Sequence, residues 1–434
     1  MRRCVIFDLD GTLTQSEEGI FNCVRYAAEK LGLPEIEGDM LRRFVGPPLK
    51  YSFMHELGLD EERADAAVAY YRERYGEKGL FENRVYPGIR TLLATLKKHG
   101  DWVAVATGKP QRPSERILEH FGLRKWIDRI VGPDNSADAG KTELVRAALP
   151  EDYDPENAYM VGDRMFDIDG GHGAGIRSIG VGYGYGTEEE LRSSGCDVYA
   201  ATVEALLSFL CPESETQRGF FLSMEGLDGA GKSTQIRLLT DALDRYGYSV
   251  VHSREPGGCM ISEKIREIIL DRANEGMTAE TEALLYAASR AQHVHDVIVP
   301  HLQAGRLLLS DRYIDSSVAY QGGGRELGVS TVMAINDHAI HGLYPDVTVF
   351  LDLPHKTALE RVYRAGEPDR MEIEGDSFHA RVEAAYREMI RLHPERFVVV
   401  DATKTPEDMG ELIAAGVLGK LDAMERAAME KDNG

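Results

Sequence analysis

Two segments of this chain repeat one local plan, and that plan restricts the folds open to it. The segments begin at Cys4 and at Gly219, and each passes from a short β-branched run through an acidic or glycine-rich turn into a helical pattern. Strands that alternate with helices in this way form parallel sheets, whose ligands bind at the carboxyl ends of the strands. The sequence therefore predicts two α/β domains, each with a turn that carries chemistry.

The length of the chain leaves room for this division. At about 150 residues per domain, its 434 residues predict about three folding units. The segment SFLCPESETQRGF, from Ser208 to Phe220, is polar, contains a proline and follows a helical pattern, which is typical of an interdomain connection. We predict a first domain over residues 1–211, a linker over 212–218 and a second domain over 219–434.

Composition and charge exclude several classes of protein. With 43% hydrophobic and 28% charged residues, the chain is unlike a collagenous, low-complexity or wholly disordered protein. Its 50 Lys and Arg against 72 Asp and Glu give a formal net charge of -22, the wrong sign for gripping nucleic acid or anionic membranes over the whole surface. We expect small-molecule partners, with phosphorylated ligands captured locally.

The cysteines and the apolar runs indicate the cellular compartment in which the protein is expected. No apolar stretch approaches the roughly 18 residues needed to cross a bilayer, and the N-terminal apolar run stops after Phe7. A reducing cytoplasm is expected. The sequence predicts neither a disulfide framework nor a structural zinc site, because its five cysteines form no CxxC pair and no zinc-type spacing: Cys4, Cys23, Cys196, Cys211 and Cys259.

The first half alternates apolar runs with helical patterns, which predicts a doubly wound, Rossmann-like parallel sheet. Its expected strands are residues 4–7, 102–106, 129–131, 158–161 and 178–181. Between the first two runs, apolar residues recur at helical spacing from Ile20 to Leu31 and from Ala67 to Tyr75. We interpret residues 14–82, approximately, as a helical cap inserted into a core of residues 1–13 and 83–211.

The second half is predicted to be another doubly wound α/β domain with a parallel sheet. Its expected strands are residues 220–224, 249–252, 306–309, 347–351 and 397–400, with helices between them. The amphipathic tail over residues 423–431 is interpreted as a solvated final helix without a function of its own.

The first turn, in VIFDLDGTL, presents two carboxylates. Asp8 and Asp10 stand two residues apart at the end of a strand, so both side chains project to the same side of the chain. Taken alone, this pair is equally compatible with an ordinary acidic turn. Further polar residues follow later apolar runs and would meet the pair at one edge of a parallel sheet: Thr107 and Gly108 in VAVATGK, Lys141 in ADAGKTELV, and Asp163 and Asp167 in MVGDRMFDIDG.

These residue types make a coherent phosphoryl-transfer site. One carboxylate can attack phosphorus and form an aspartyl-phosphate, while a second protonates the leaving alcohol and then activates water. Magnesium, held by a few carboxylates and waters, would offset the repulsion between carboxylate and phosphate. Thr and Lys side chains can hold the phosphoryl oxygens.

On these motifs, residues 1–210 resemble the haloacid dehalogenase superfamily of phosphatases. The resemblance implies Asp8 as nucleophile, Asp10 as acid and base, and Thr107, Gly108 and Lys141 as phosphate-binding residues. Its candidate metal ligands are Asp8, Asp10, Asp163 and Asp167. The cap suits the helical-cap subclass, and FVGPPLKYSF and RSIGVGYGYGTEEEL look like phosphoglycolate phosphatase-like and nucleotidase-like members, so the substrate stays open. Arg43 and Lys50, which flank Gly46-Pro47-Pro48, are either substrate contacts or solvated surface charges.

The second turn, in FFLSMEGLDGAGKSTQ, satisfies GxxxxGK[ST] between a strand and an amphipathic helix. Backbone amides and the helix N-terminus can cradle phosphate, Lys232 can reach the outer phosphates, and Ser233 can ligate magnesium. The sequence therefore predicts an ATP-binding P-loop made of Gly226, Leu227, Asp228, Gly229, Ala230, Gly231, Lys232, Ser233 and Thr234.

Basic and aromatic residues recur in the blocks after this P-loop. They are Arg254 in SREPGG, Tyr286 and Arg290 in LLYAASRAQH, Asp311, Arg312, Tyr320 and Gln321 in LLSDRYIDSSVAYQGGGRELG, and Arg364 and Arg370 in the charged segment RVYRAGEPDRMEIE. A cluster of arginines beside a P-loop suits the transfer of phosphate to a phosphorylated acceptor, because two anions must be brought together.

On these blocks, residues 219 to about 420 resemble thymidylate kinase, a P-loop nucleoside monophosphate kinase. The resemblance implies that Lys232 and Ser233 serve ATP and Mg²⁺, that Arg254 and Arg312 hold the dTMP phosphate, and that Asp311 assists phosphate and metal positioning. Tyr286 would stack on thymine, Arg290 would hydrogen-bond the base, Asp228 would contact the 3'-hydroxyl, and Tyr320 and Gln321 would line the nucleoside pocket. A homodimer formed through the kinase domain is also implied.

The sequence departs from that family at three positions. Gly229 stands where some members place a P-loop arginine, so Arg364 or Arg370 of the expected lid would supply the missing catalytic charge. Cys259 replaces a frequent Thr, and position 286 is Tyr rather than Phe. These two differences concern the details of the pocket.

Three functional hypotheses follow. In the leading one, the protein is bifunctional, a dTMP kinase joined to a phosphate-monoester hydrolase. In the second, the first domain senses a phosphorylated ligand without turning it over. In the third, the P-loop half is a non-enzymatic nucleotide switch, for which the arginines at 254, 290 and 312 have no evident use.

Overall fold

The computed structural model describes residues 2–45, 49–133, 140–212, 217–365, 370–371 and 373–432. The chain forms two compact units, Met1–Ser214 with Asp244–Gly247, and Glu215–Leu243 with Tyr248–Gly434. Parts of three sequence predictions lie outside the described residues: the Gly46-Pro47-Pro48 turn, residues 213–216 of the linker, and residues 366–369 and 372 of the lid.

The first unit is built on a parallel sheet with the order β5-β4-β1-β6-β7-β8. Its central strand β1 is buried from Cys4 to Phe7, which matches the apolar run that predicted it. All five predicted strands are present. The strands are β1 (Arg2–Phe7), β4 (Trp102–Ala106), β5 (Arg129–Val131), β6 (Tyr153–Gly162), β7 (Arg177–Val181) and β8 (Val198–Ala200).

Helices connect the strands of this sheet, as the alternation in the sequence predicts. They are α5 (Ile89–Lys98), α6 (Gln111–His120), α7 (Lys141–Ala148), α8 (Met165–Ala174), α9 (Glu188–Ser193) and α10 (Val203–Leu210), with a short 3-10 turn, η2 (Arg124–Trp126). The order of the strands places β1 between β4 and β6, so the turns that follow these three strands meet at one edge.

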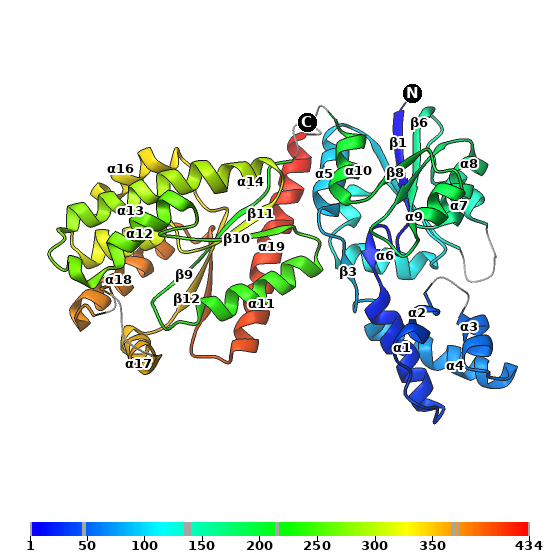
Figure 1. Cartoon of the computed structure of the whole chain (residues 1–434), viewed down its shortest axis with the longest axis horizontal. Helices are drawn as coiled ribbons and strands as arrows, with labels where there is room; N and C mark the ends of the chain where they lie inside the picture. Colours follow the sequence, from blue (N-terminus) through cyan, green and yellow to red (C-terminus); the bar gives the residue numbers. More distant parts are fainter. Residues whose placement is uncertain are drawn as a thin grey trace. The chain divides into compact units, whose positions relative to one another are not determined.

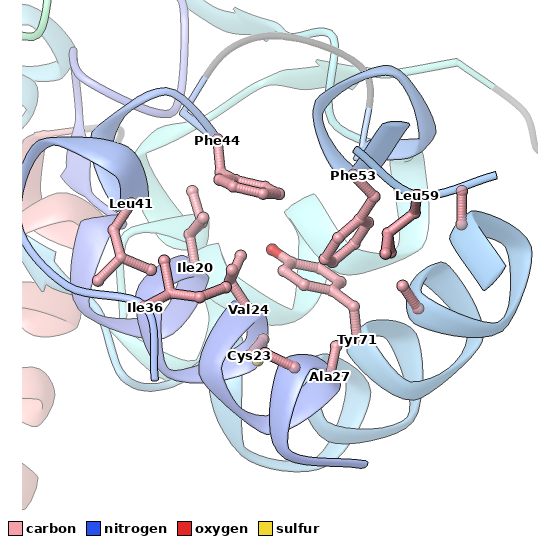
Figure 2. Close-up of a cluster of buried hydrophobic side chains, with 13 residues drawn as sticks. Ile20, Cys23, Val24, Ala27, Ile36, Leu41, Phe44, Phe53, Leu59 and Tyr71 are labelled. Atoms are coloured by element: carbon pink, nitrogen blue, oxygen red, sulfur yellow. The ribbon is translucent and has the colours of Figure 1, made fainter. Parts of the chain in front are cut away.

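The predicted helical cap is an insertion between β2 (Thr14–Gln15) and β3 (Arg84–Val85), which pair antiparallel. Its elements are α1 (Glu17–Lys30), α2 (Asp39–Arg42), α3 (Leu49–Glu56), α4 (Glu61–Arg74) and the π-helical turn η1 (Tyr75–Gly79). Figure 2 shows the apolar core that these helices enclose, including Phe44 against Phe53 with ring centroids 5.1 Å apart. The cap therefore has a hydrophobic core of its own.

The second unit is built on a parallel sheet with the order β10-β11-β9-β12-β13. Its predicted strands are all present: β9 (Phe221–Gly226), β10 (Val250–Arg254), β11 (Leu307–Asp311), β12 (Val347–Asp352) and β13 (Phe397–Asp401). Figure 1 shows α13 (Ala279–His293) and α16 (Val329–Ile340) on one side of this sheet, and α11 (Lys232–Arg245) and α19 (Pro406–Asp432) on the other.

The other helices of this unit connect its strands and pack on the sheet or on neighbouring helices. They are α12 (Met260–Leu270), α14 (Val299–Gln303), α15 (Ile314–Ser317), α17 (His355–Ala365) and α18 (Asp376–Leu392), with the 3-10 turn η3 (Arg272–Asn274) and the π-helical turns η4 (Val294–Ile298) and η5 (Val318–Gly324). No helix among the described residues is long and apolar enough to cross a membrane.

The final helix begins earlier in the chain than the sequence indicated. Residues 423–431 are the last turns of the 27-residue helix α19, and apart from the buried Glu425 they are exposed or half-buried, as expected for a solvated end. Leu421 is fully buried, and the buried Glu425 accepts a hydrogen bond of 3.0 Å from the Tyr248 hydroxyl. The amphipathic pattern thus reflects packing of this helix against its own domain.

Candidate active sites

The acidic turn of the first unit lies at the carboxyl edge of its sheet. Asp8 directly follows β1, Thr107 follows β4, and Asp163 follows β6. Because these strands are neighbours in a parallel sheet, residues more than 150 positions apart in the sequence lie side by side. Lys141 begins α7 and reaches the same place.

Four predicted residues form one buried cluster. The Lys141 ammonium lies 2.6 Å from Asp8 Oδ1 and 2.6 Å from Asp167 Oδ1. Carboxylate oxygens of Asp8, Asp163 and Asp167 all lie within 4.8 Å of one another. A Cβ atom at Gly162 would stand 2.2 Å from the Asp167 Cβ, so a glycine is needed for this close approach.

The electrostatics of the cluster suit a bound cation. Burial raises the pKa of Asp8 to about 7 against the opposing charge of Lys141, and Asp167 and Asp163 add to the rise. Burial and the charge of Asp167 raise the pKa of Asp163 to about 6. Carboxylates that raise one another's pKa in a buried place are the oxygen donors that Mg²⁺ prefers, so Asp8, Asp163 and Asp167 fit a magnesium site.

Asp10 stands apart from these three carboxylates. Among the described residues, the carboxylates close enough to share a metal ion are those of Asp8, Asp163 and Asp167. Asp10 is not one of them, although the sequence suggested it as a ligand. Its Oδ2 instead forms an ion pair of 2.9 Å with Lys109. The geometry therefore favours the acid and base role over the metal role for its side chain.

The remaining predictions for this site differ in their outcome. Thr107 is buried beside the cluster, and its hydroxyl accepts a hydrogen bond of 3.2 Å from the Lys109 amide, while Gly108 is exposed. Lys109 was not among the predicted site residues, although it follows Thr107 closely in the TGK run. Arg43 pairs with Glu56 at 2.9 Å, and Lys50 with Glu61 at 3.0 Å, which favours the interpretation of both as surface charges.

The P-loop of the second unit joins the end of β9 to the start of α11. Lys232 is buried, and its ammonium donates to the Gly226 and Leu227 carbonyls, each at 3.1 Å, and to Asp228 Oδ1 at 3.2 Å. Gly226, Gly229 and Gly231 have positive φ angles of 140°, 83° and 96°, which side chains rarely tolerate. Ser233 and Thr234 are exposed at the first turn of α11.

Asp228 links this loop to the segment after β11. Arg312 donates to Asp228 Oδ1 at 2.5 Å, and the Tyr320 hydroxyl donates to Asp228 Oδ2 at 3.3 Å. Burial by itself would raise the pKa of Asp228, but the charges of Arg312 and Lys232 hold it below its ordinary value. Asp228 is therefore an ionised acceptor between two cations.

A pocket opens beside this group. Its lining includes six residues that the sequence predicted for the acceptor nucleotide: Asp228, Tyr286, Arg290, Arg312, Tyr320 and Gln321. The Arg290 guanidinium is oriented by Glu255 at 2.7 Å, the Ser317 hydroxyl at 3.0 Å and the Tyr313 carbonyl at 3.2 Å. These bonds fix the guanidinium of Arg290 in one wall of the pocket, where only 1% of its side chain is exposed.

Two predicted residues lie outside the lining of this pocket. Arg254 is exposed and pairs with Glu263 at 3.0 Å. Asp311 ends β11, and its buried Oδ1 has no hydrogen-bond partner among the described residues. An unpartnered buried carboxylate oxygen is costly, and it is compatible with the predicted role in positioning a metal ion.

Comparison with known proteins follows the same division of the chain. Residues 224–413 match the thymidylate kinase family model. The thymidylate kinase of Lactobacillus helveticus is 48% identical over 210 residues, which are 47% of this chain and 98% of that protein. That of Geobacillus thermodenitrificans is 45% identical over 210 residues, 48% of this chain and 93% of that protein. The chain belongs to the thymidylate kinase family.

The region ahead of this kinase domain is haloacid dehalogenase-like. Residues 5–181 match the family model of haloacid dehalogenase-like hydrolases. A solved structure described as a predicted phosphatase from Clostridium acetobutylicum is 41% identical, with a TM-score of 0.44, and covers 49% of this chain and 99% of that one. A haloacid dehalogenase-like hydrolase from Streptococcus pneumoniae is 30% identical, with a TM-score of 0.44, and covers 48% and 98%.

The lid arginines of the thymidylate kinase domain lie in different surroundings. Arg364 is 80% exposed, with Glu360 3.7 Å away. Arg370 is buried, 2.7 Å from Glu282, and donates to the Ile269 carbonyl at 2.7 Å. Among the described residues of α17 and the segment after it, Arg361 donates to the P-loop, with the Gly229 carbonyl as acceptor at 3.2 Å. Arg361 was not among the predicted site residues, although it precedes Arg364 by one helical turn.

The different surroundings of Arg364 and Arg370 lead to a stability prediction. Arg370→Ala removes one cation from the buried Glu282, which keeps Arg325 at 3.1 Å, so we expect a loss of about 2 kcal/mol. This corresponds to a fall of about 5 °C in the melting temperature of the kinase domain, measured by calorimetry. Arg364→Ala is the matched control and should leave that temperature unchanged. Equal shifts in both variants would contradict the assignment of Arg370 as a buried anchor of the lid.

Proposed function

We propose that this protein carries two phosphoryl-transfer activities. Its thymidylate kinase domain transfers the γ-phosphate of ATP to dTMP, giving dTDP and ADP, and its haloacid dehalogenase-like domain hydrolyses a phosphate monoester. The observation that supports the first activity is the pocket beside the P-loop, where Arg290 and Arg312 converge with Tyr286. The observation that supports the second is the buried cluster of Asp8, Lys141 and their neighbours.

In the kinase site, the protein's own cations would gather the two anionic substrates. Lys232 and Ser233 serve ATP, Arg254 and Arg312 hold the phosphate of dTMP, and Tyr286 and Arg290 hold its base. Asp228 would accept a hydrogen bond from the 3'-hydroxyl of the sugar. Ser233 and Asp311 would hold Mg²⁺, which would supply neutralisation of phosphate charge. Of the two candidate lid arginines, Arg364 or Arg370, the exposed Arg364 would be the one to move to the transferring phosphate, because Arg370 is buried against Glu282.

An acceptor panel tests the kinase assignment. Full-length protein with ATP and Mg²⁺ is given dTMP, UMP, CMP or AMP, and ADP is measured by a coupled assay. We expect dTMP to be preferred over each of the others by at least about tenfold in kcat/KM, because a pocket built to hydrogen-bond a base rejects acceptors that leave its donors unpaired. Equal rates with all four acceptors would contradict the assignment.

In the hydrolase site, Asp8 would attack the phosphorus atom and form an aspartyl-phosphate. Asp10 would give a proton to the leaving alcohol and then take one from the attacking water, while Thr107, Gly108 and Lys141 hold the phosphoryl oxygens. Asp8, Asp163 and Asp167 would hold Mg²⁺, which supplies charge neutralisation between nucleophile and phosphate.

A substrate panel tests this second activity and distinguishes it from ligand sensing. Full-length protein is given nucleoside monophosphates, phosphoglycolate and sugar phosphates with Mg²⁺ or with EDTA, and released phosphate is measured. We expect release from at least one substrate, with loss in EDTA. Failure with the whole panel would favour a domain that binds phosphate without turnover. A preference for phosphoglycolate would contradict the idea that the hydrolase acts on nucleotides in the kinase's own pathway.

A homodimer formed through the kinase domain is also proposed, as the family resemblance implies. The packed helices α12 and α13 carry exposed apolar side chains that such an interface would cover: Met260, Ile261, Ile268 and Leu284. Sedimentation of the full-length protein and of a Leu284→Glu variant would test this assembly, and a monomeric wild type would contradict it.

A further inference from the structure

Lys109 occupies an unusual place for a lysine, at the junction of the hydrolase core and its cap. Only 9% of its side chain is exposed, and its ammonium lies 2.9 Å from Asp10 Oδ2. The ammonium also donates to the Tyr75 hydroxyl and lies 4.9 Å from the centre of the Tyr75 ring. A buried ammonium is costly unless its partners are well placed, so this arrangement holds all three groups in one geometry.

The ion pair leaves one oxygen of Asp10 available. Asp10 Oδ2 is paired with the Lys109 ammonium, whereas the buried Oδ1 has no hydrogen-bond partner among the described residues. A carboxyl group that is fixed through one oxygen presents the other in a defined direction. Transfer of a proton to a leaving group needs this kind of alignment.

Tyr75 belongs to the cap, at the start of the π-helical turn η1. This turn is anchored on both sides. Arg116 of the core helix α6 donates to the Gly76 carbonyl at 2.8 Å. On the other side, a Cβ atom at Gly19 of α1 would stand 2.0 Å from the Gly79 carbonyl oxygen. The Tyr75 hydroxyl, which accepts a hydrogen bond from Lys109, is therefore positioned by the packing of the cap.

We propose that Lys109 is the positioning residue for Asp10, and that Tyr75 couples the position of the cap to this residue. The proposal rests on the hydrolase activity proposed above. Lys109 touches neither the phosphorus nor the leaving group in this role. It orients the carboxyl group that does the proton transfer.

The proton transfers balance without a change at Lys109. As the bond from Asp8 to phosphorus forms, the bond from phosphorus to the leaving oxygen breaks, and that oxygen takes the proton of Asp10 Oδ1. Water then attacks the aspartyl-phosphate, its proton passes to Asp10, and Asp8 is released with inorganic phosphate. Lys109 keeps its protons through both steps.

The dependence on the leaving group tests the proposal. Lys109→Met keeps the length of the side chain and removes its charge. The value of kcat/KM reports the steps up to departure of the leaving group, and nitrophenolate departs without a proton, whereas an alkoxide needs one. We therefore expect the variant to lose about 10- to 100-fold in kcat/KM with an alkyl phosphate that the wild type hydrolyses, and to change little with p-nitrophenyl phosphate.

Further variants separate positioning from general damage. Tyr75→Phe, which removes one hydroxyl, should shift the ratio of the two kcat/KM values in the same direction as Lys109→Met, but by a smaller factor. Lys109→Arg, which keeps the charge, should give a ratio between those of Lys109→Met and the wild type. The matched control is Lys97→Met, which removes a lysine paired with Asp128 at 2.7 Å and should leave the ratio unchanged.

The outcomes distinguish the two proposals. If the wild type hydrolyses both substrates and Lys109→Met and Tyr75→Phe lower both values equally or not at all, the positioning role is overturned and the hydrolase stands. If the wild type releases phosphate from no substrate of the panel, both proposals fall. A selective loss with the alkyl phosphate supports both.

Discussion

Replacing Lys232 by alanine is expected to abolish dTMP-dependent formation of ADP while hydrolysis of phosphate monoesters continues. The Lys232 ammonium is buried against the P-loop carbonyls of Gly226 and Leu227 and against Asp228, so it is held in place before a substrate arrives. Removal of one preorganised charge-stabilising donor costs about 100- to 1000-fold in kcat. The measurement is the rate of ADP formation at saturating ATP and dTMP.

Two comparisons make this result specific. Lys420→Ala removes another lysine of the same domain, one that contacts the Glu395 carbonyl, and should leave the kinase rate unchanged. Phosphate release by the hydrolase, measured on the same Lys232→Ala sample, should equal that of the wild type. A kinase rate within a factor of about three of the wild type would remove Lys232 from the proposed role.

Asp8→Asn is expected to abolish phosphate release and to leave kinase activity intact. The amide has nearly the shape of the carboxylate, but it is a far weaker nucleophile and a weaker metal ligand. Loss of the nucleophile in covalent catalysis costs about 1000-fold or more. Since Lys141 also pairs with Asp167 at 2.6 Å, the variant keeps a partner for this buried ammonium, and we expect it to fold.

The control for this experiment is Asp152→Asn, because Asp152 is an exposed acid of the same domain. Its phosphate release should match that of the wild type. Trapping supplies a second measurement: the wild type should incorporate label from a phosphorylated substrate into acid-stable protein during turnover, whereas Asp8→Asn should not. Retained hydrolysis in Asp8→Asn would exclude Asp8 as the nucleophile.

The strands show how far an apolar pattern predicts a fold. The buried runs at β1, β4 and β9 were predicted to within two residues at each end, because strands covered on both faces are continuously apolar. The short strand β8 was missed, since Val198 and Tyr199 are only half-buried. The first half of β6 was missed as well, because residues 153–157 are polar and more exposed than the rest of the strand. Strand residues that face solvent need not be apolar, so an exposed strand lacks the apolar run on which the prediction depends.

Local sequence predicts the place of the P-loop but not the contacts of the buried Glu282. The P-loop is one continuous run of residues whose backbone makes the site, so its place in the chain could be predicted from local sequence. The neighbours of Glu282 show the opposite case. Gln321, Arg325 and Arg370 all converge on this one buried carboxylate, and nothing in the spacing of these residues predicts that convergence.

The sequence alone determined the two α/β domains, the inserted cap, the P-loop and the residue types of an aspartate-based phosphoryl-transfer site. Each depends on local periodicity or on a contiguous motif. Only the tertiary structure decided that Asp10 pairs with Lys109, that Tyr75 reaches this pair from the cap, and that Arg361 rather than Arg364 contacts the P-loop. Long charged side chains can reach partners that are far away in the sequence, and burial in the folded chain determines which of these pairs form.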